Sequence, residues 1–216
     1  MSVNEDRVTT PQSVAVTAVP GIADPAPLGL AAFALTTFLL SAFNAGWMTH
    51  SSGLAWVGYA FAYGGLCQLL AGMWEFRNRN VFGATAFSTY GGFWIGLFFY
   101  FQLYGAKLAT HPLTAGLFAK DVGWILLAFA IFNTYMLLWS TQVNMAVFGV
   151  FLTLELTEII LFIGNFSGSS GTVKFGGYLG VLTALVAWYT SAAGVTNGMG
   201  GRISLPVGKP LLAPRA

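Results

Sequence analysis

Two glutamates, Glu155 and Glu158, lie in the segment "ELTE" at the centre of a long apolar run. A carboxylate at the centre of a membrane-spanning helix costs about 2.5–3.5 kcal/mol on insertion scales, so each glutamate needs a proton, a partner or water. On a helical wheel Glu158 lies about 40° from Leu154, and Glu155 lies about 60° beyond Glu158. We therefore expect Glu158 to face any path through the protein, protonated or hydrogen-bonded to Thr, Asn or Tyr, and Glu155 to face a neighbouring helix. Both are candidates for proton coupling; the alternative is a neutral hydrogen bond that only joins two helices.

Weakly polar residues also recur at helical spacing within the other apolar runs. One such stripe contains Phe61, Gln68 and Glu75, and no stripe contains Lys or Arg. Because polar residues inside a membrane face a bundle interior or a water-filled cavity, the stripes predict a narrow path lined by hydroxyl, amide and aromatic groups. The alternative for each residue is a structural hydrogen bond between helices. The stripe residues that we expect to line the path are Thr37, Leu40, Asn44, Gln68, Thr183, Ala187 and Thr190.

The composition of the chain indicates which kind of protein carries these stripes. Of its 216 residues, 56% are hydrophobic and only 7% are charged, whereas a soluble domain contains about 25% charged residues. This is too little charge to cover a water-facing surface, so we predict an all-α, polytopic membrane protein embedded in a lipid bilayer. The shorter, alternating segments of a β-barrel are not seen. A net charge of +2 is too small to indicate nucleic-acid binding.

The apolar runs and the basic residues predict the topology. A membrane-spanning helix needs about 20 mostly apolar residues. Six runs reach that length, at residues 27–48, 54–75, 81–104, 122–141, 144–165 and 175–197. Basic residues concentrate on the cytoplasmic side of membrane proteins, which favours a topology with both termini inside. We accordingly expect a disordered cytoplasmic tail (1–23), a six-helix transmembrane domain (24–198) and a cytoplasmic C-terminal tail (199–216).

The residue types that carry out catalysis or bind metals are sparse. Cys67 is the only cysteine, and His50 and His111 have no partner at the spacing of metal ligands. No nucleophile and base are paired in the sequence. We therefore expect neither an enzyme nor a bound metal or cofactor.

The segment "DPAPLGL", residues 24–30, precedes the first apolar run. Asp24 can cap a helix by accepting backbone N–H bonds, and Pro25 suits the first helical turn because its missing N–H would be unpaired there. The remaining free N–H groups and the helix dipole attract a carboxylate. The segment is therefore a candidate anion-binding entrance, and the alternative is a capped helix with no further role. Its members are Asp24, Pro25, Ala26, Pro27, Leu28, Gly29 and Leu30.

Three ordered blocks of the chain resemble the acetate uptake transporter family, whose bacterial members include the succinate–acetate permeases. They are "DPAPLGLAAF" from residue 24, "YGGLCQLLAGMWEF" at 63–76 and "NVFGATAFSTYGGFW" at 80–94. The resemblance implies a hexamer of six-helix subunits, each with its own pore. It also implies a hydrophobic constriction formed by Phe33, Tyr90 and Leu154. The chain departs from the family pattern at Asp24, where the family has Asn.

Together these observations predict a transporter of acetate, and of succinate as in some members of the family, in the cytoplasmic membrane of a prokaryote. Transport is expected to be channel-like or coupled to protons. The alternative is a channel for a small neutral solute such as ammonia, urea or a short amide, because its lining would look similar.

Overall fold

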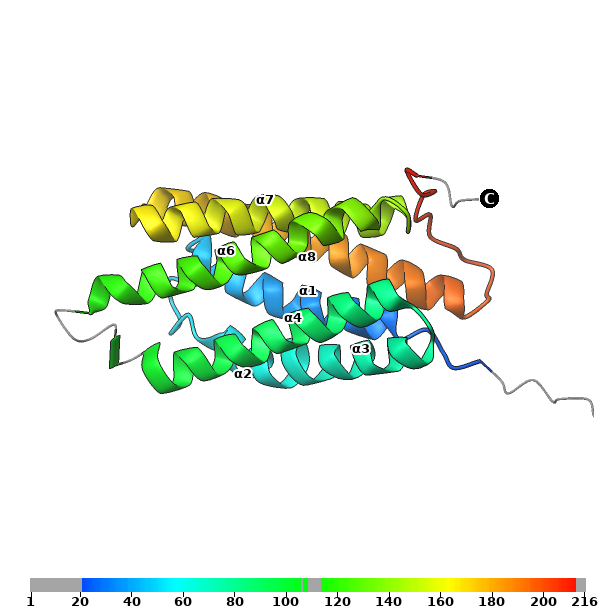
Figure 1. Ribbon diagram of the computed structural model, residues 1–216, viewed down its shortest axis with the longest axis horizontal. Helices are drawn as coiled ribbons and strands as arrows, with labels where there is room; N and C mark the ends of the chain where they lie inside the picture. Colours follow the sequence, from blue (N-terminus) through cyan, green and yellow to red (C-terminus); the bar gives the residue numbers. More distant parts are fainter. Residues whose placement is uncertain (1–20, 106, 109–113, 213–216) are drawn as a thin grey trace, which may run out of the picture.

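The computed structural model describes residues 21–105, 107–108 and 114–212. This part of the chain folds into helices that lie side by side along the long axis of the molecule and contains no β-strand, which confirms the all-α prediction (Figure 1). In chain order the helices are α1 (Ala26–Asn44), α2 (Ala55–Phe61), η1 (Ala62–Cys67), α3 (Gln68–Arg77), α4 (Val81–Tyr100), η2 (Phe101–Gly105), α6 (Ala115–Ser140), α7 (Met145–Ser167) and α8 (Ser170–Gly198).

Four of these helices are long and apolar enough to cross a membrane by length and composition. They are α1, α6 from Gly116 onward, α7 and α8. The region predicted as the second span is helical over residues 55–77, but the π-helical η1 divides it into shorter pieces. α4, which covers most of the predicted third span, has 20 residues, including four glycines, two threonines and two tyrosines.

The start of α1 differs by one position from the sequence prediction. α1 begins at Ala26, so Pro25 is the N-cap residue rather than part of the first turn. The carboxylate of Asp24 still binds this turn, because the backbone N of Ala26 donates to Oδ1 of Asp24 over 2.9 Å. Asp24 thus stabilises the helix start from the residue before the cap.

Side-chain caps begin the later helices. The side chain of Asn80 accepts from the backbone N of Gly83 at the start of α4, and Asn144 accepts from Val147 at the start of α7. These bonds satisfy N–H groups that a helix leaves unpaired in its first turn. Gly168 ends α7 in the left-handed conformation with φ of 67°, which glycine adopts without steric cost.

Small residues allow the helices to pack closely around the interior. A Cβ atom added at Gly177 of α8 would collide with the backbone of Ala45 at the end of α1. One added at Gly72 of α3 would lie 2.6 Å from the backbone N of Ser88 in α4. Such approaches let helices associate in lipid, where the hydrophobic effect provides no drive.

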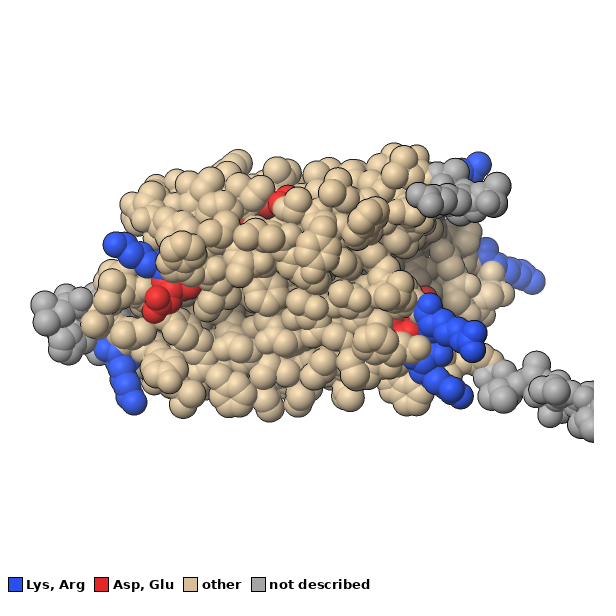
Figure 2. Space-filling model, in the orientation of Figure 1, with Lys and Arg blue, Asp and Glu red and all other residues tan. Residues whose placement is uncertain are grey.

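The Lys and Arg residues gather at the two ends of the molecule (Figure 2). On the face drawn in Figure 2, a broad belt without Lys or Arg separates the ends. α6 directs large apolar side chains outward within this belt, including Trp124, Ile131 and Leu138, which are each at least 60% exposed. The described basic residues are Arg77, Arg79, Arg202 and Lys209 towards the end where α1 begins, and Lys107, Lys120 and Lys174 towards the other end.

The segment that follows α8 is bound to the end of the bundle. The side chain of Asn197 exchanges two hydrogen bonds of 2.9 Å with the backbone of Leu205, and the backbone N of Ala146 donates to the oxygen of Val207. The hydroxyl of Tyr189 donates to the oxygen of Pro206 over 2.6 Å. Of the predicted N-terminal tail, residues 1–20 lie outside the described part of the chain.

Candidate functional site

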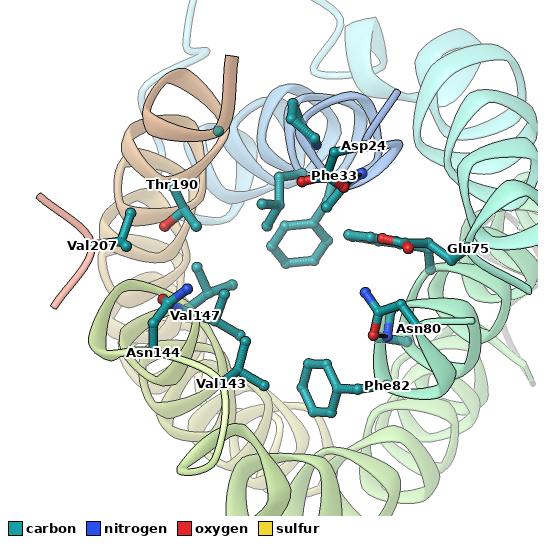
Figure 3. Close-up of a pocket in the computed structure, with 18 of the residues that line it drawn as sticks. Asp24, Phe33, Glu75, Asn80, Phe82, Val143, Asn144, Val147, Thr190 and Val207 are labelled. Atoms are coloured by element: carbon teal, nitrogen blue, oxygen red, sulfur yellow. Dashed lines mark hydrogen bonds between the residues drawn. The ribbon is translucent and has the colours of Figure 1, made fainter. Parts of the chain in front are cut away.

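A large cavity opens at the end of the bundle where α1, α4 and α7 begin and where α3 and α8 end (Figure 3). Its volume of about 430 Å³ falls in the range of pockets that bind small molecules, about 300–1,000 Å³. The wall combines apolar side chains with amides, a hydroxyl and two carboxyl groups. Its polar residues are Asp24, Gln68, Glu75, Asn78, Asn80, Asn144, Thr190 and Asn197.

A second cavity, of about 40 Å³, lies further along the bundle. Most of its polar groups come from α1 and α7, and α4 adds the hydroxyl of Tyr90 and the indole N–H of Trp94. Those from α1 and α7 are Thr37, Ser41, Asn44, Thr157 and Glu158.

Three side chains belong to the walls of both cavities, and they are Phe33 of α1, Tyr90 of α4 and Leu154 of α7. The rings of Phe33 and Tyr90 meet edge to face with their centroids 5.8 Å apart, a favourable arrangement for aromatic pairs. All three side chains are buried and belong to the same apolar cluster. They therefore form a partition between the cavities, built from three different helices.

Hydrogen bonds hold the tyrosine of this partition. The hydroxyl of Tyr90 donates to Oδ1 of Asn133 on α6 over 3.0 Å, and it also lies within bonding distance of Oε1 of Glu158, at 3.4 Å. The rings of Phe129 and Phe132 pack against the Tyr90 ring. The position of the ring thus depends on polar groups of two neighbouring helices.

Glu155 is paired with α6. Its Oε2 accepts from Nδ2 of Asn133 over 2.7 Å, and its Oε1 accepts from the hydroxyl of Thr134 over 2.8 Å. Nδ2 of Asn133 also donates to the backbone oxygen of Phe151. Both carboxyl oxygens of Glu155 therefore have donors, and Asn133 connects Glu155 to Tyr90.

Glu158 is less completely paired. It is buried in the wall of the small cavity, and its Oε2 has no hydrogen-bond partner among the described residues. Among the residues that the structure describes, Tyr90 alone donates to its other oxygen. The structure thus places one glutamate of "ELTE" against a neighbouring helix and the other against a cavity.

Glu75 is a cavity residue that our sequence analysis did not select. It lies near the C-terminal end of α3 and is fully buried. The signal was present, because Glu75 shares a helical stripe with Gln68, which we did select. Both residues line the large cavity, and each has an Oε1 atom without a hydrogen-bond partner in the described structure.

Most of the predicted path-lining residues lie in the wall of one of the two cavities. Those in the wall of the large cavity are Asp24, Ala26, Pro27, Leu30, Gln68 and Thr190, and those in the wall of the small cavity are Thr37, Leu40 and Asn44.

The remaining predicted residues lie outside both walls, and they are Pro25, Leu28, Gly29, Thr183 and Ala187. Leu28 is 47% exposed on the outer side of α1. Gly29 packs against the ring of Phe87, and a Cβ there would lie 2.7 Å from that ring. The buried hydroxyl of Thr183 lies 3.1 Å from that of Thr157, and Ala187 is buried in the apolar cluster.

The described residues contain no group of three His, Cys, Asp or Glu side chains that could hold a metal ion. Apolar helices that surround two cavities define a multi-pass membrane protein. Residues 8–209 match the GPR1/FUN34/yaaH family, and the chain belongs to this family. The match confirms the resemblance to acetate uptake transporters.

Individual relatives agree with this assignment. Acetate permease A of Emericella nidulans is 41% identical over 198 residues, which cover 86% of this chain. This chain spans only 65% of the length of that permease. The succinate-acetate/proton symporter SatP of Escherichia coli K12 is 33% identical over 188 residues, which cover 87% of this chain and 96% of SatP.

A solved structure is similar over almost its whole length. The structure described as "Structure of the bacterial acetate channel SatP" superposes on this chain with a TM-score of 0.77 and 32% sequence identity. The superposition covers 87% of this chain and 99% of that one. The helical arrangement is thus shared with a transport protein.

Proposed function

We propose that this chain carries acetate, and also succinate, across a membrane through the path formed by the two cavities. The observation that carries the proposal is the similarity to the acetate channel SatP over 99% of that chain. The permease and symporter relatives support the same substrate class. The two cavities and their common partition support a path along the bundle.

The physical need for such a path follows from the charge of the substrate. A simple carboxylic acid with a pKa of about 4.3 is about 99.8% ionised at pH 7, so almost none of it is in the neutral form that crosses lipid. Hydroxyl and amide groups can replace part of the water that a carboxylate loses. The lining of both cavities offers such groups next to apolar surface.

The constriction, the entrance and the proton-coupling site of the proposed path are formed by different residues. Phe33, Tyr90 and Leu154 are the constriction, because they separate a cavity of about 430 Å³ from one of about 40 Å³. The start of α1, with Asp24, forms part of the entrance. Glu158 is the candidate proton-coupling group because it faces the path with an unpaired oxygen, whereas Glu155 holds α7 to α6.

The same proposal includes a topology. Six helical segments cross the cytoplasmic membrane, with α2, η1 and α3 together forming one span, and both termini are cytoplasmic. The helices run alternately in opposite directions. The end where α1 begins and where the C-terminal segment lies holds Arg77, Arg79, Arg202 and Lys209. This charge distribution supports the orientation.

We further propose that the chain forms a homo-oligomer, a hexamer by family resemblance. Gly92 and Gly96 of α4 support a contact surface, since both are exposed and an added Cβ at either would meet nothing within 4 Å. Pairs of glycines at this spacing let helices of neighbouring subunits approach closely. The mass of the purified protein, measured by light scattering with the detergent contribution subtracted, tests this.

A counterflow assay with the purified protein in liposomes tests the transport proposal. Labelled acetate should exchange into vesicles loaded with unlabelled acetate faster than into protein-free vesicles. An imposed proton gradient separates the two modes, because a symporter accumulates acetate in response to it and a channel conducts without it. Ammonia flux without acetate exchange would instead favour a channel for a neutral solute.

A further inference from the structure

The large cavity contains a buried carboxyl group that the proposed path leaves without a role. Glu75 lies in the cavity wall with 0% of its surface exposed (Figure 3). Its Oε2 accepts a hydrogen bond from Nδ2 of Asn78 over 3.2 Å. Its Oε1 is buried and accepts no hydrogen bond within the described part of the chain, while the amide of Asn80 also lies beside the carboxyl group. A buried acceptor without a donor is destabilising, so the position suits a proton or a ligand.

The neighbouring helix leaves room for this oxygen. Gly83 in the first turn of α4 faces Glu75, and a Cβ at that position would lie 2.7 Å from Oε1. A larger residue would therefore displace the carboxyl group. Gln68, two turns deeper on the same side of α3, is the next buried polar group along the wall, and its Oε1 is also unpaired in the described structure.

The charged groups near Glu75 are predominantly acidic on the cavity side. Asp24, which precedes α1, lines the same cavity. α1 and α4, which pack on α3, contain no Asp, Glu, Lys, Arg or His, and η1 contributes only Tyr63 and Cys67 as titratable groups. Arg77 and Arg79, which follow Glu75 in the chain, are exposed and lie outside the cavity wall.

A carboxylate that enters this cavity therefore meets two carboxyl groups and no Lys or Arg among the described lining residues. Like charges at close range disfavour the ionised forms, and a shared proton relieves the repulsion. A metal ion is a weaker explanation, because no three potential ligands cluster in the described chain.

We propose that Glu75 is the proton-binding group of the large cavity and that its protonated form holds an incoming carboxylate by a hydrogen bond from Oε1. This inference rests on the proposed transport function and adds a proton site on the opposite side of the constriction from Glu158. Because the ionised glutamate repels the anion and the protonated one binds it, proton and carboxylate increase each other's affinity by the same factor.

The number of protons taken up with each bound acetate tests the proposal. Acetate is titrated into the purified full-length protein by calorimetry at several pH values, each in two buffers with different ionisation enthalpies. The wild-type protein should take up close to one proton per acetate at a pH where free Glu75 is ionised, and less as the pH falls and free Glu75 becomes protonated. Glu75→Gln, which keeps the shape of the side chain, should lose this uptake, and its acetate affinity should no longer depend on pH. Asp121→Asn removes an exposed carboxylate at the other end of the bundle and serves as the matched control with unchanged uptake.

Unchanged uptake in Glu75→Gln, or wild-type binding without uptake, would overturn the proposal. If Glu75→Gln does not assemble, Asp24→Asn and Glu158→Gln decide the matter, because these residues and Glu75 are the only Asp or Glu among the described lining residues of the two cavities. Uptake retained in both variants supports Glu75, and uptake lost in either one assigns the proton elsewhere. A wild-type protein that neither binds nor exchanges acetate would contradict the transport function itself, which is a separate result.

Discussion

The two cavities share three side chains but differ in volume, in position along the bundle and in the chemistry of their walls. The large one, of about 430 Å³, lies at the end with the helix starts of α1, α4 and α7 and is rich in amides. The small one, of about 40 Å³, is lined mainly by hydroxyl and apolar groups together with Glu158. A water molecule requires about 10–15 Å³ of such volume, so the small cavity holds only a few waters. On the proposed path, a solute would remain hydrated in the large cavity and would lose most of its water at the partition.

Removing a side chain from the partition should have the largest effect. Leu154→Ala should join the cavities, so the variant should take up larger acids such as lactate faster than the wild type does. It should also lose about 2–5 kcal/mol of stability, as buried Leu-to-Ala changes do. Lactate uptake in liposomes and thermal unfolding measure the two effects. Leu156→Ala, at an exposed position of the same helix, is the control with unchanged selectivity. An assembled Leu154→Ala protein that takes up lactate no faster than the wild type would contradict the constriction.

The hydroxyl of Tyr90 should matter for stability more than for selectivity. Tyr90→Phe keeps the ring in the partition but leaves Oδ1 of Asn133 and Oε1 of Glu158 without their donor. Unpaired buried acceptors cost about 1–3 kcal/mol, which unfolding measurements can detect. Lactate uptake should stay at the wild-type rate. Tyr135 is the control, because its hydroxyl makes no hydrogen bond in the described structure. Tyr135→Phe should therefore change stability little. Equal losses of stability in the two variants would argue against the hydrogen-bond network around Tyr90.

Glu158 places a carboxyl group in the wall of the small cavity. Its proposed role in proton coupling can be tested separately. Glu158→Gln keeps shape and hydrogen bonding but cannot release a proton. We expect proton-driven accumulation of acetate to fall about tenfold, equivalent to about 1.4 kcal/mol, while exchange without a gradient continues. Accumulation at several external pH values is the measurement. Glu155→Gln should retain coupling, because Glu155 is paired with α6 and lies outside both cavity walls. If Glu158→Gln accumulates acetate with an unchanged pH profile, Glu158 is a structural residue.

At the mouth of the large cavity the expected effect is smallest. Asp24→Asn introduces the family residue and removes a negative charge, so acetate uptake should stay the same or rise. Asp24→Ala removes the acceptor for the N–H of Ala26 and should cost about 1 kcal/mol of stability. Initial uptake rates and unfolding curves check both. Equal loss of uptake in the two variants would show that the charge of Asp24 has a role of its own.

The sequence predicted the helices well because hydropathy depends on composition over many residues. It predicted the wall residues less well where the helix departs from regular geometry. The stripe of Phe61, Gln68 and Glu75 assumed a constant rotation per residue, but η1 lies between Phe61 and Gln68 and contains π-helical turns. A π turn changes the angular register. Phe61 consequently packs against Phe98 and Phe99, whereas Gln68 and Glu75 line the cavity.

On α8 the difficulty was local pairing rather than helix geometry. Thr183 and Thr190 share a stripe, but only Thr190 lines a cavity. Thr183 is buried against Thr157, and a helical wheel does not reveal which polar residues face each other across two helices. The division of the path into two unequal cavities also depends on three-dimensional packing and has no counterpart in the sequence.

The absence of Lys and Arg from the described walls of both cavities has a kinetic consequence. A carboxylate bound to a fixed guanidinium or ammonium group would gain the attraction of an opposite charge in addition to its hydrogen bonds. On the proposed path, hydroxyl and amide groups would hold it without that attraction, so its residence time in each cavity would be short. Conduction requires sites that a solute leaves as readily as it reaches them. Such a path would favour turnover at high solute concentration over scavenging of traces.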